Sequence, residues 1–273
     1  MAITFSQEIF EKICSSATNS TAEVYDMIAP HFDDTLQSIN RVLLGDMADK
    51  LESVPGLEHA VTKLVCLRTY QEQIPELDLV LTPTGFGVVS NQNLAPASAD
   101  RVKNLLQQVT NAYEDTYDRC LELLVGTDWA ETAQARINIP NLIYTARQLQ
   151  MYVEYPSSDV HRSSLNECRS RMYQAEEKLR QHVSAEFFDH MLEQTRRNAF
   201  TKEETAMADY MCKFIGFCIM KNWAAAKSML ERIENYAESK VEVFTSYKDS
   251  EAYKVKHFQT YQNEKEDSIY FWG

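Results

Sequence analysis

The stretch "TKEETAMADYMCKFIGFCIM", residues 201–220, carries the clearest folding signal in the chain. It opens with Thr201 and Glu204 at the spacing of a capping box, in which the hydroxyl and the carboxylate each satisfy a backbone N–H at a helix start. Its apolar side chains recur every three or four residues, as on one face of an α-helix. These positions are Ala206, Met207, Tyr210, Met211, Phe214, Ile215 and Phe217 or Cys218. The stretch therefore predicts a helix over 202–220 with one broad buried face.

Working outward, helix breakers are scarce in the second half of the chain. Every proline lies at or before Pro156, and no glycine occurs between Gly126 and Gly216. A second capping box, Ser164 to Glu167, marks another helix start. The second half should form helices over 165–182, 185–197, 202–220, 223–246 and 250–262. The first half should form them over 21–29, 31–50, 57–73, 99–125 and 129–154, the last broken before Pro140.

One segment of the first half has a different pattern. Apolar residues alternate from Leu77 to Leu81, the turn-forming sequence Thr82-Pro83-Thr84-Gly85 follows, and an extended run resumes at Val88-Val89. Alternation on both sides of a Pro/Gly turn predicts a β-hairpin, here at about 77–91. The two glycines of Gly85-Phe86-Gly87 lack the Lys-Ser/Thr of a P-loop and the third glycine of a dinucleotide fold. We therefore expect Phe86 to pack against another element or another subunit.

These patterns define the expected fold class. The chain should be mostly α, a multi-helix bundle with one small β-hairpin (about 77–91) and an extended C-terminal tail. The loop 154–164, rich in serine, is the expected hinge between two helical layers. The resulting domains are an N-terminal helical part with the hairpin (1–156), a C-terminal helical part (157–262) and the tail (263–273).

Charge and cysteine usage limit the possible partners. The 27 Lys+Arg and 40 Asp+Glu residues give a formal charge of -13, so the average surface repels phosphate backbones and anionic lipid. A basic stripe would have to be assembled by folding, because the longest basic run is a pair. The longest apolar stretch, 214–220, is too short to span a bilayer, so we expect no membrane partner. The six cysteines include no C-x2-C pair and lie among apolar neighbours, which favours buried thiols in a reducing compartment.

The strongest candidate for chemistry is a set of three residues. His182, Glu186 and His190 are spaced four residues apart and would share one face if the surrounding segment were a single helix, which would offer a partial zinc site. Ser184-Ala185-Glu186 could equally begin a new helix, which would leave a solvated polar face. No G-x-S-x-G sequence occurs, and the acidic pairs are adjacent, which points their carboxylates apart. We therefore predict no catalytic, cofactor-binding or metal-binding residue, and no cofactor.

The last eleven residues, "NEKEDSIYFWG", combine a charged stretch with four large apolar side chains. Ile269, Tyr270, Phe271 and Trp272 would expose several hundred Å2 of surface if left in water, so something must cover them. Two surfaces could bury these side chains, the core of the same protein or a groove on a neighbouring subunit. The predicted interface residues are therefore Gly85, Phe86 and Gly87 of the hairpin with Ile269, Tyr270, Phe271 and Trp272 of the tail.

Two segments also resemble a known family. "DLVLTPTGFGVVSNQNLAPASADRV", followed by a long predicted helix, and "NEKEDSIYFWG" are similar to a family of unassigned function in tailed bacteriophages and prophages of gut bacteria. The resemblance implies a virion component similar to helical head-to-tail connectors (neck adaptors). From this resemblance, the absence of a catalytic signature, the expected hairpin and the apolar tail, we predict a non-enzymatic ring of identical chains in the neck of the virion, assembled in the cytoplasm of the bacterial host. The implied partners are the portal or other neck and tail proteins, while DNA passes without sequence-specific binding.

Two other functions are compatible with the sequence. The first is a cytosolic helical metal-dependent enzyme built around His182, Glu186 and His190. The second is a helical partner-binding protein that is not part of the virion. Metal content separates the first from a structural protein, and the protein content of purified particles separates the second.

Overall fold

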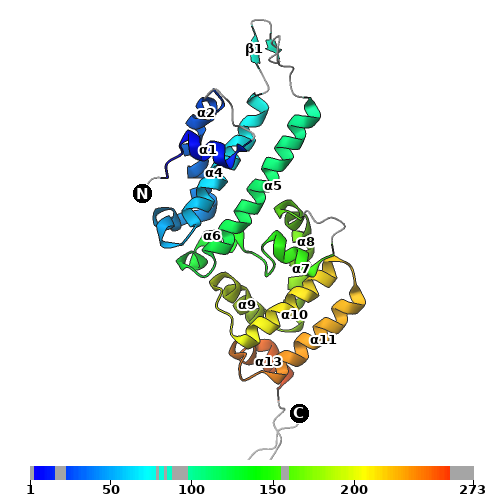
Figure 1. The fold of residues 1–273 in the computed structure, drawn as a ribbon. Helices are drawn as coiled ribbons and strands as arrows, with labels where there is room; N and C mark the ends of the chain where they lie inside the picture. Colours follow the sequence, from blue (N-terminus) through cyan, green and yellow to red (C-terminus); the bar gives the residue numbers. More distant parts are fainter. Residues whose placement is uncertain are drawn as a thin grey trace, which may run out of the picture. The chain divides into compact units, whose positions relative to one another are not determined.

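The computed structural model describes residues 3–15, 23–77, 80–82, 85–87, 98–154 and 160–258. These residues are mostly α-helical, as the sequence predicted. They form two compact units, and the helices of each unit can be followed in Figure 1. Unit 1 comprises Met1–Cys168 with Thr195–Ala199, and unit 2 comprises Arg169–Gln194 with Phe200–Gly273.

Unit 1 is built around two long helices, α4 and α5, which lie side by side and run in opposite directions (Figure 1). Leu64 of α4 and Leu121 of α5 are fully buried. Trp129 is also fully buried, and its indole N–H donates to the Leu43 carbonyl at 2.6 Å. The α-helices of this unit are α1 (Gln7–Ile13), α2 (Glu23–Ile28), α3 (Phe32–Ile39), α4 (Leu57–Leu77), α5 (Ala99–Leu124), α6 (Ala133–Asn138) and α7 (Ala146–Tyr152).

The single helix predicted over 31–50 is wrong. The chain instead forms α3, a π-helical turn at Asn40–Leu44 and a 3-10 helix at Gly45–Ser53. Three carbonyls of the π-helical turn accept side-chain donors: Arg41 from the Gln134 amide at 3.5 Å, Val42 from the Asn138 amide at 2.9 Å and Leu43 from Trp129. Gly45 then has φ +56°, a conformation that other residues rarely adopt. Tertiary hydrogen bonds and one glycine therefore redirect the helix.

The helix predicted over 129–154 is divided as well, with Pro140 in the break as expected. A 3-10 turn at Asp128–Glu131 and α6 precede the break, and α7 follows it. Helix α7 begins with a capping box in which Thr145 accepts from the Gln148 N–H at 3.2 Å and the Gln148 side chain accepts from the Thr145 N–H at 3.2 Å. Helix α1, which the sequence analysis did not predict, is capped by Ser6.

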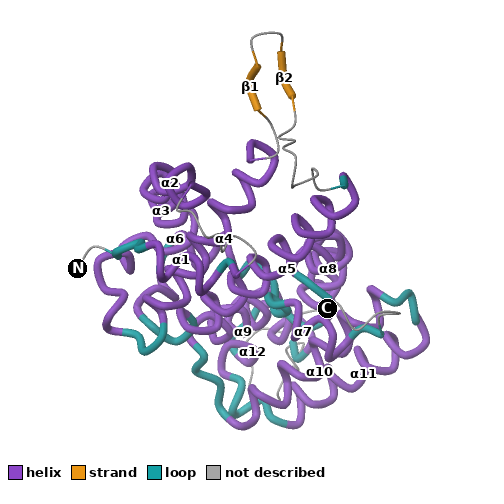
Figure 2. The backbone as a smooth tube through the Cα atoms, turned by 45° about the horizontal axis from the view of Figure 1, so that its top comes forward, coloured by secondary structure: helices purple, strands orange, loops and turns teal. Residues whose placement is uncertain are grey.

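Two short strands lie between α4 and α5, within the range expected for the hairpin. Strand β1 (Val80–Thr82) pairs antiparallel with β2 (Gly85–Gly87), with Leu81 opposite Phe86 (Figure 2). The other positions between 78 and 97 lie outside the described residues. The structure therefore places Gly85, Phe86 and Gly87 together in one strand.

Unit 2 contains the remaining helices. Helix α9 coincides with the predicted range 185–197, and α10 opens with the predicted capping box of Thr201 and Glu204. Helix α11 ends at Ser239, not at 246, because the chain turns there and buries Phe244, which is 2% exposed. The helices are α8 (Arg162–His182, from its eighth residue on), α9 (Ala185–Arg197, up to Gln194), α10 (Lys202–Ile219), α11 (Trp223–Ser239), α12 (Thr245–Lys248) and α13 (Glu251–Lys256).

The division of the chain falls inside α8, beyond the end of the expected hinge. The first turns of α8 belong to unit 1 because Arg162 pairs there with Asp118 of α5. The second predicted capping box is wrong for the same reason, since Ser164 lies within α8 and not before it. The tail 263–273 lies outside the described residues.

Candidate functional site

A polar cleft of about 550 Å3 opens on unit 1, between α3 with its π-helical continuation, α4 and α5. This volume is within the range of small-molecule and peptide-binding pockets. Its lining is largely polar, with Thr35, Arg68, Glu72 and Tyr113 among its side chains. The full lining is His31, Asp34, Thr35, Ser38, Ile39, Val42, Leu43, Arg68, Glu72, Gln73, Tyr113 and Tyr117.

Arg68 is held in place by three neighbours. Its Nη2 lies 2.7 Å from Glu72 Oε1, one turn further along α4, and its Nη1 donates to Gln71 Oε1 at 3.2 Å. The guanidinium lies 5.6 Å from the centre of the Tyr113 ring. Burial raises the pKa of Tyr113, although Arg68 opposes the rise. Tyr113 therefore keeps its proton at neutral pH and can donate a hydrogen bond.

Hydrogen bonds also fix the walls of the cleft. Thr69 of α4 donates to Thr35 of α3 at 3.0 Å, and Tyr117 of α5 donates to the Asn138 side chain of α6. The charges that line the cleft largely offset one another, since Arg68 is paired with Glu72 and only Asp34 adds a further carboxylate. The polar cleft therefore presents several hydrogen-bond donors and acceptors, suited to binding a polar surface or a small polar molecule.

A buried ion pair anchors the start of α8 to unit 1. Arg162 Nη1 lies 2.5 Å from Asp118 Oδ1, and both side chains are only 10% exposed. Asp118 also accepts from the Ala146 N–H at 2.7 Å, and Arg162 stacks over the Tyr117 ring, 4.4 Å from its centre. Burial raises the pKa of Asp118, and Arg162 and the Ala146 N–H oppose that rise. Both groups have structural partners, so the pair ties helices together.

The three residues of the possible zinc set do not share one face. Helix α8 ends at His182 and α9 begins at Ala185, so Ser184 starts a new helix and accepts from the Phe187 N–H at 3.1 Å. Glu186 accepts from the Ser184 hydroxyl at 2.8 Å, while His190 lies 2.6 Å from Glu204. Within the described ranges, no cluster of three or more His, Cys, Asp and Glu side chains could hold a metal ion.

All six cysteines are buried, as the sequence predicted, and none forms a disulfide. Burial raises the pKa of the Cys14, Cys66 and Cys120 thiols to about 12, and it also raises those of Cys212 and Cys218. A thiol with a raised pKa carries little thiolate at neutral pH and is a poor nucleophile. These cysteines therefore act as small core side chains.

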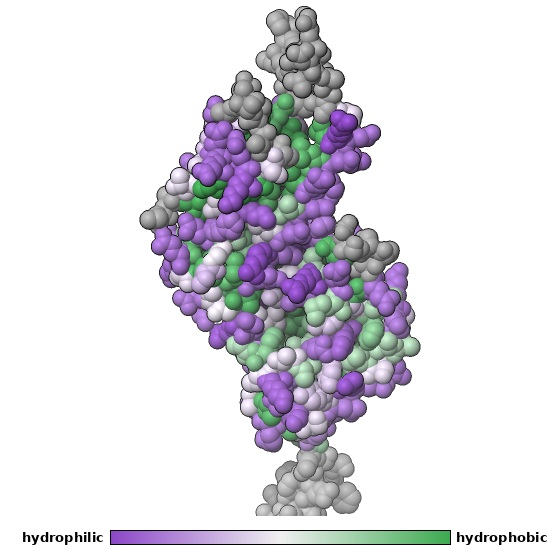
Figure 3. Space-filling model, viewed as in Figure 1, coloured by the Kyte–Doolittle hydropathy of each residue, from purple (hydrophilic) through white to green (hydrophobic). Residues whose placement is uncertain are grey.

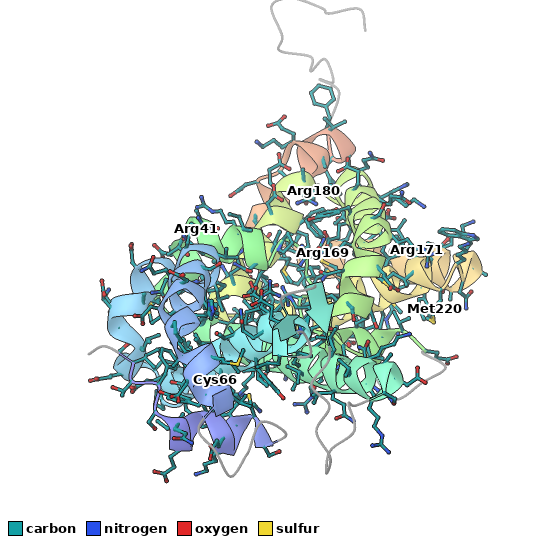
Figure 4. The ribbon with its side chains drawn as sticks, turned by 90° about the horizontal axis from the view of Figure 1, so that it is seen from above. Arg41, Cys66, Arg169, Arg171, Arg180 and Met220 are labelled. Carbon is teal, nitrogen blue, oxygen red and sulfur yellow. The ribbon has the colours of Figure 1, made fainter. Side chains whose placement is uncertain are left out.

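Folding does assemble a small basic recess, which the sequence alone could not locate. Arg171 and Lys178 of α8 meet Lys221 and Trp223 at the turn between α10 and α11, around a cavity of about 140 Å3. Lys178 Nζ lies 4.8 Å from the centre of the Trp223 ring, which is 57% exposed. Arg171 extends towards the end of α10, near Met220 (Figure 4), and donates to the Ile219 carbonyl at 3.5 Å.

The predicted interface residues fall in two parts of the chain. Gly85, Phe86 and Gly87 form β2, whereas 269–272 lie outside the described residues. Elsewhere the surface is mostly hydrophilic, with apolar patches between the polar areas (Figure 3). Large side chains contribute to the apolar surface, among them Met27 at 53% exposed and Ile137 at 66%.

Comparison with known proteins places the polar cleft in a region shared with other proteins. A family of unknown function, DUF6712, matches residues 30–139, less than half of the chain. Every residue that lines the polar cleft falls inside this range. Neither the curated proteins nor the solved structures include a match to the chain. In the part of the chain that the structure describes, no helix has both the length and the apolar character to cross a membrane.

Proposed function

We propose that the chain is a structural component of a tailed-phage virion, a helical head-to-tail connector that assembles as a ring of identical subunits. In this proposal it carries out no reaction and needs no cofactor. The hairpin at about 77–91 and the extended tail 263–273 are its contact devices, and the portal or other neck and tail proteins are its neighbours. The virion neck is its location, after assembly in the cytoplasm of the bacterial host.

The observation that carries the proposal is the pair of strands β1 and β2. Their backbone pairing extends over three residue pairs, from Val80 with Gly87 to Thr82 with Gly85. A two-stranded hairpin is at best marginally stable alone in water, and its outer edges can pair with another chain. The hairpin block is also the segment that resembles the phage family. A subunit contact at Phe86 would supply the cover that so small a ribbon needs.

Charge supports the same proposal. A formal charge of -13 suits a channel through which DNA moves without being held, because a strongly basic lumen would retain the phosphate backbone. Many of the ionisable side chains within the two units serve to join helices, as Asp118 joins Arg162 and His190 joins Glu204. Packing contacts and not a reaction centre therefore account for these groups.

Size-exclusion chromatography with light scattering, over a range of protein concentrations, tests the ring. We expect an oligomer of fixed order that forms closed rings in negative-stain images, because heterologous contacts that close by rotation give rings. Phe86→Ala should weaken assembly, whereas Ile137→Ala, a matched loss of apolar surface at a 66% exposed position, should leave it intact. A chain that stays monomeric and binds neither portal nor tail proteins would refute the proposal.

Two further measurements address the other functions. A stoichiometric transition metal in the purified protein would favour the metal-dependent enzyme over the connector. A monomer that binds a partner but is missing from purified particles would favour the partner-binding protein that is not part of the virion.

A further inference from the structure

A second opening on unit 1, which we name the isoleucine groove, has no occupant assigned to it. It lies between α1 and the start of α4, has a volume of about 620 Å3 and takes its apolar surface from Ile3, Ile9 and Ile13. Helix α1 packs on α4 through Phe10, which is fully buried, while Ile9 on a neighbouring face is left 37% exposed. The groove is therefore a hollow apolar surface of a size that can hold large side chains.

The rim of the groove is more basic than the chain as a whole. Lys12, Lys63 and His59 line it, and Glu58 is the one carboxylate in the lining. Neither Lys12 nor Lys63 is paired with a carboxylate among the described residues. In a chain with a formal charge of -13, an apolar hollow between two unpaired lysines fits an acidic and apolar segment.

We propose that the segment 264–272 of a second copy of this chain binds in the isoleucine groove. The segment is acidic and then apolar, which complements the lysines and the isoleucines of the groove. It carries Glu264, Glu266 and Asp267 with one lysine, followed by the four large apolar residues Ile269 to Trp272. The aromatic side chains fill the hollow beside the isoleucines, and the carboxylates face Lys12 and Lys63. Burying such anchors in a pocket is the usual source of affinity in a small contact.

The contact is heterologous, because the tail of one copy meets a different surface on the next copy. Such a contact repeats from subunit to subunit and closes into a ring when the rotation allows. The inference therefore deepens the proposed function and rests on it for the identity of the partner.

A complementation experiment separates this contact from other ways of assembling. A groove variant carries Lys12→Glu with Lys63→Glu, and a tail variant carries Phe271→Ser with Trp272→Ser, both in the full chain. Each variant alone should be monomeric by light scattering, because each has lost one half of the contact. An equimolar mixture should form a one-to-one complex, since the intact tail of one variant can bind the intact groove of the other. Monomers only in the mixture, while the parent chain oligomerises, would overturn the inference.

Peptide binding tests the groove without assembly. A fluorescent peptide of residues 262–273 should bind the tail variant, and the two lysine reversals should weaken that binding by roughly tenfold or more. A peptide in which Glu264, Glu266 and Asp267 are replaced by lysine should recover binding to a chain that carries both the groove and tail substitutions. A control that reverses two exposed lysines outside the groove, Lys103 and Lys240, should leave binding unchanged.

The outcomes distinguish the two proposals. If the parent chain forms rings and the groove and tail variants form them equally well, the inference is wrong and the proposed ring stands. If the parent chain is monomeric, both the ring and the contact between copies are wrong, even where the peptide binds the groove and the groove variant loses that binding. Should the double lysine variant fail to fold, Ile9→Asp, at an exposed position of the groove, replaces it, and peptide binding unaffected by this change would also overturn the inference.

Discussion

Replacing Asp118 by alanine should destabilise unit 1 strongly, because it leaves a buried guanidinium without its counter-charge. Arg162 is only 10% exposed and lies 2.5 Å from Asp118. Breaking a buried pair by removing one partner costs about 3–5 kcal/mol. The Ala146 N–H, which donates a hydrogen bond to Asp118 at 2.7 Å, also loses its acceptor. Against a total stability of about 5–15 kcal/mol, this loss is large.

The melting temperature of unit 1 should fall by about 10 °C, since each kcal/mol shifts a domain of this size by roughly 2–4 °C. Trp129 is fully buried in unit 1 and reports its unfolding, provided that the other two tryptophans are replaced by phenylalanine. Urea titration followed by Trp129 fluorescence gives the free energy of unfolding of that unit alone. This choice avoids treating a chain of two units as a single two-state transition.

Two controls make the reasoning refutable. Asp115 lies one turn before Asp118 on α5 and pairs with His161 at 2.9 Å, but it is 61% exposed, so Asp115→Ala should cost at most about 1 kcal/mol. Asp118→Leu with Arg162→Met removes both charges and should cost much less than Asp118→Ala, because the raised pKa of Asp118 shows that burial opposes its charge. A loss below about 1 kcal/mol for Asp118→Ala, or a double variant just as unstable, would show that the pair does not anchor α8.

Three further changes test other parts of the structure. Burial opposes the charge of Glu204, but its hydrogen bonds outweigh this and lower its pKa below the ordinary 4.5. The charged carboxylate therefore stabilises the fold above pH 4.5, and this stabilisation is lost as the pH falls through the lower pKa of the folded state. Glu204→Gln should therefore make the melting temperature less dependent on pH between pH 6 and 3. Gly45→Ala should cost about 1–3 kcal/mol in urea titration, chiefly because φ is +56°; a Cβ would also lie 2.9 Å from the flexible end of the Gln134 side chain, which must shift. Gly56→Ala, at φ +82° with open space around it, should cost less. Phe86→Ala should reduce the assembled fraction in light scattering and leave the melting temperature of the monomer unchanged. A lower melting temperature of the monomer would show that Phe86 packs within its own subunit.

The helices could be predicted wherever local signals and tertiary contacts agree. Thr201 and Glu204 form the expected capping box, with the Glu204 N–H donating to the Thr201 hydroxyl at 3.2 Å and the Thr201 N–H donating to the Glu204 carboxylate at 2.8 Å. The same spacing at Ser164 and Glu167 does not mark a helix start, because carboxylates of α5 hold Arg162 and Ser163. Helix α8 therefore begins at Arg162, before Ser164. Local sequence therefore predicts a helix start only where no distant partner competes for it.

The polar cleft could not be predicted from any short motif. Its lining comes from three separated segments, 31–43, 68–73 and 113–117, and each contributes side chains spaced along a helix. Arg68 and Glu72 are four residues apart, which by itself predicts only an exposed ion pair on a helix. What makes them part of a cleft is the position of Tyr113 on α5, and that depends on the packing of α4 against α5.

The basic recess illustrates why the average charge of a chain does not fix the sign of each surface. Arg171 and Lys178 are two turns apart on α8 and so share a face, while Lys221 is brought to them by the turn after α10. Lys221 can occupy that turn because it adopts φ +58°, which closes the chain between α10 and α11. Trp223, at the first position of α11, then lies beneath the Lys178 ammonium group. Three cations and an indole from two chain segments thus form one surface that a formal charge of -13 conceals.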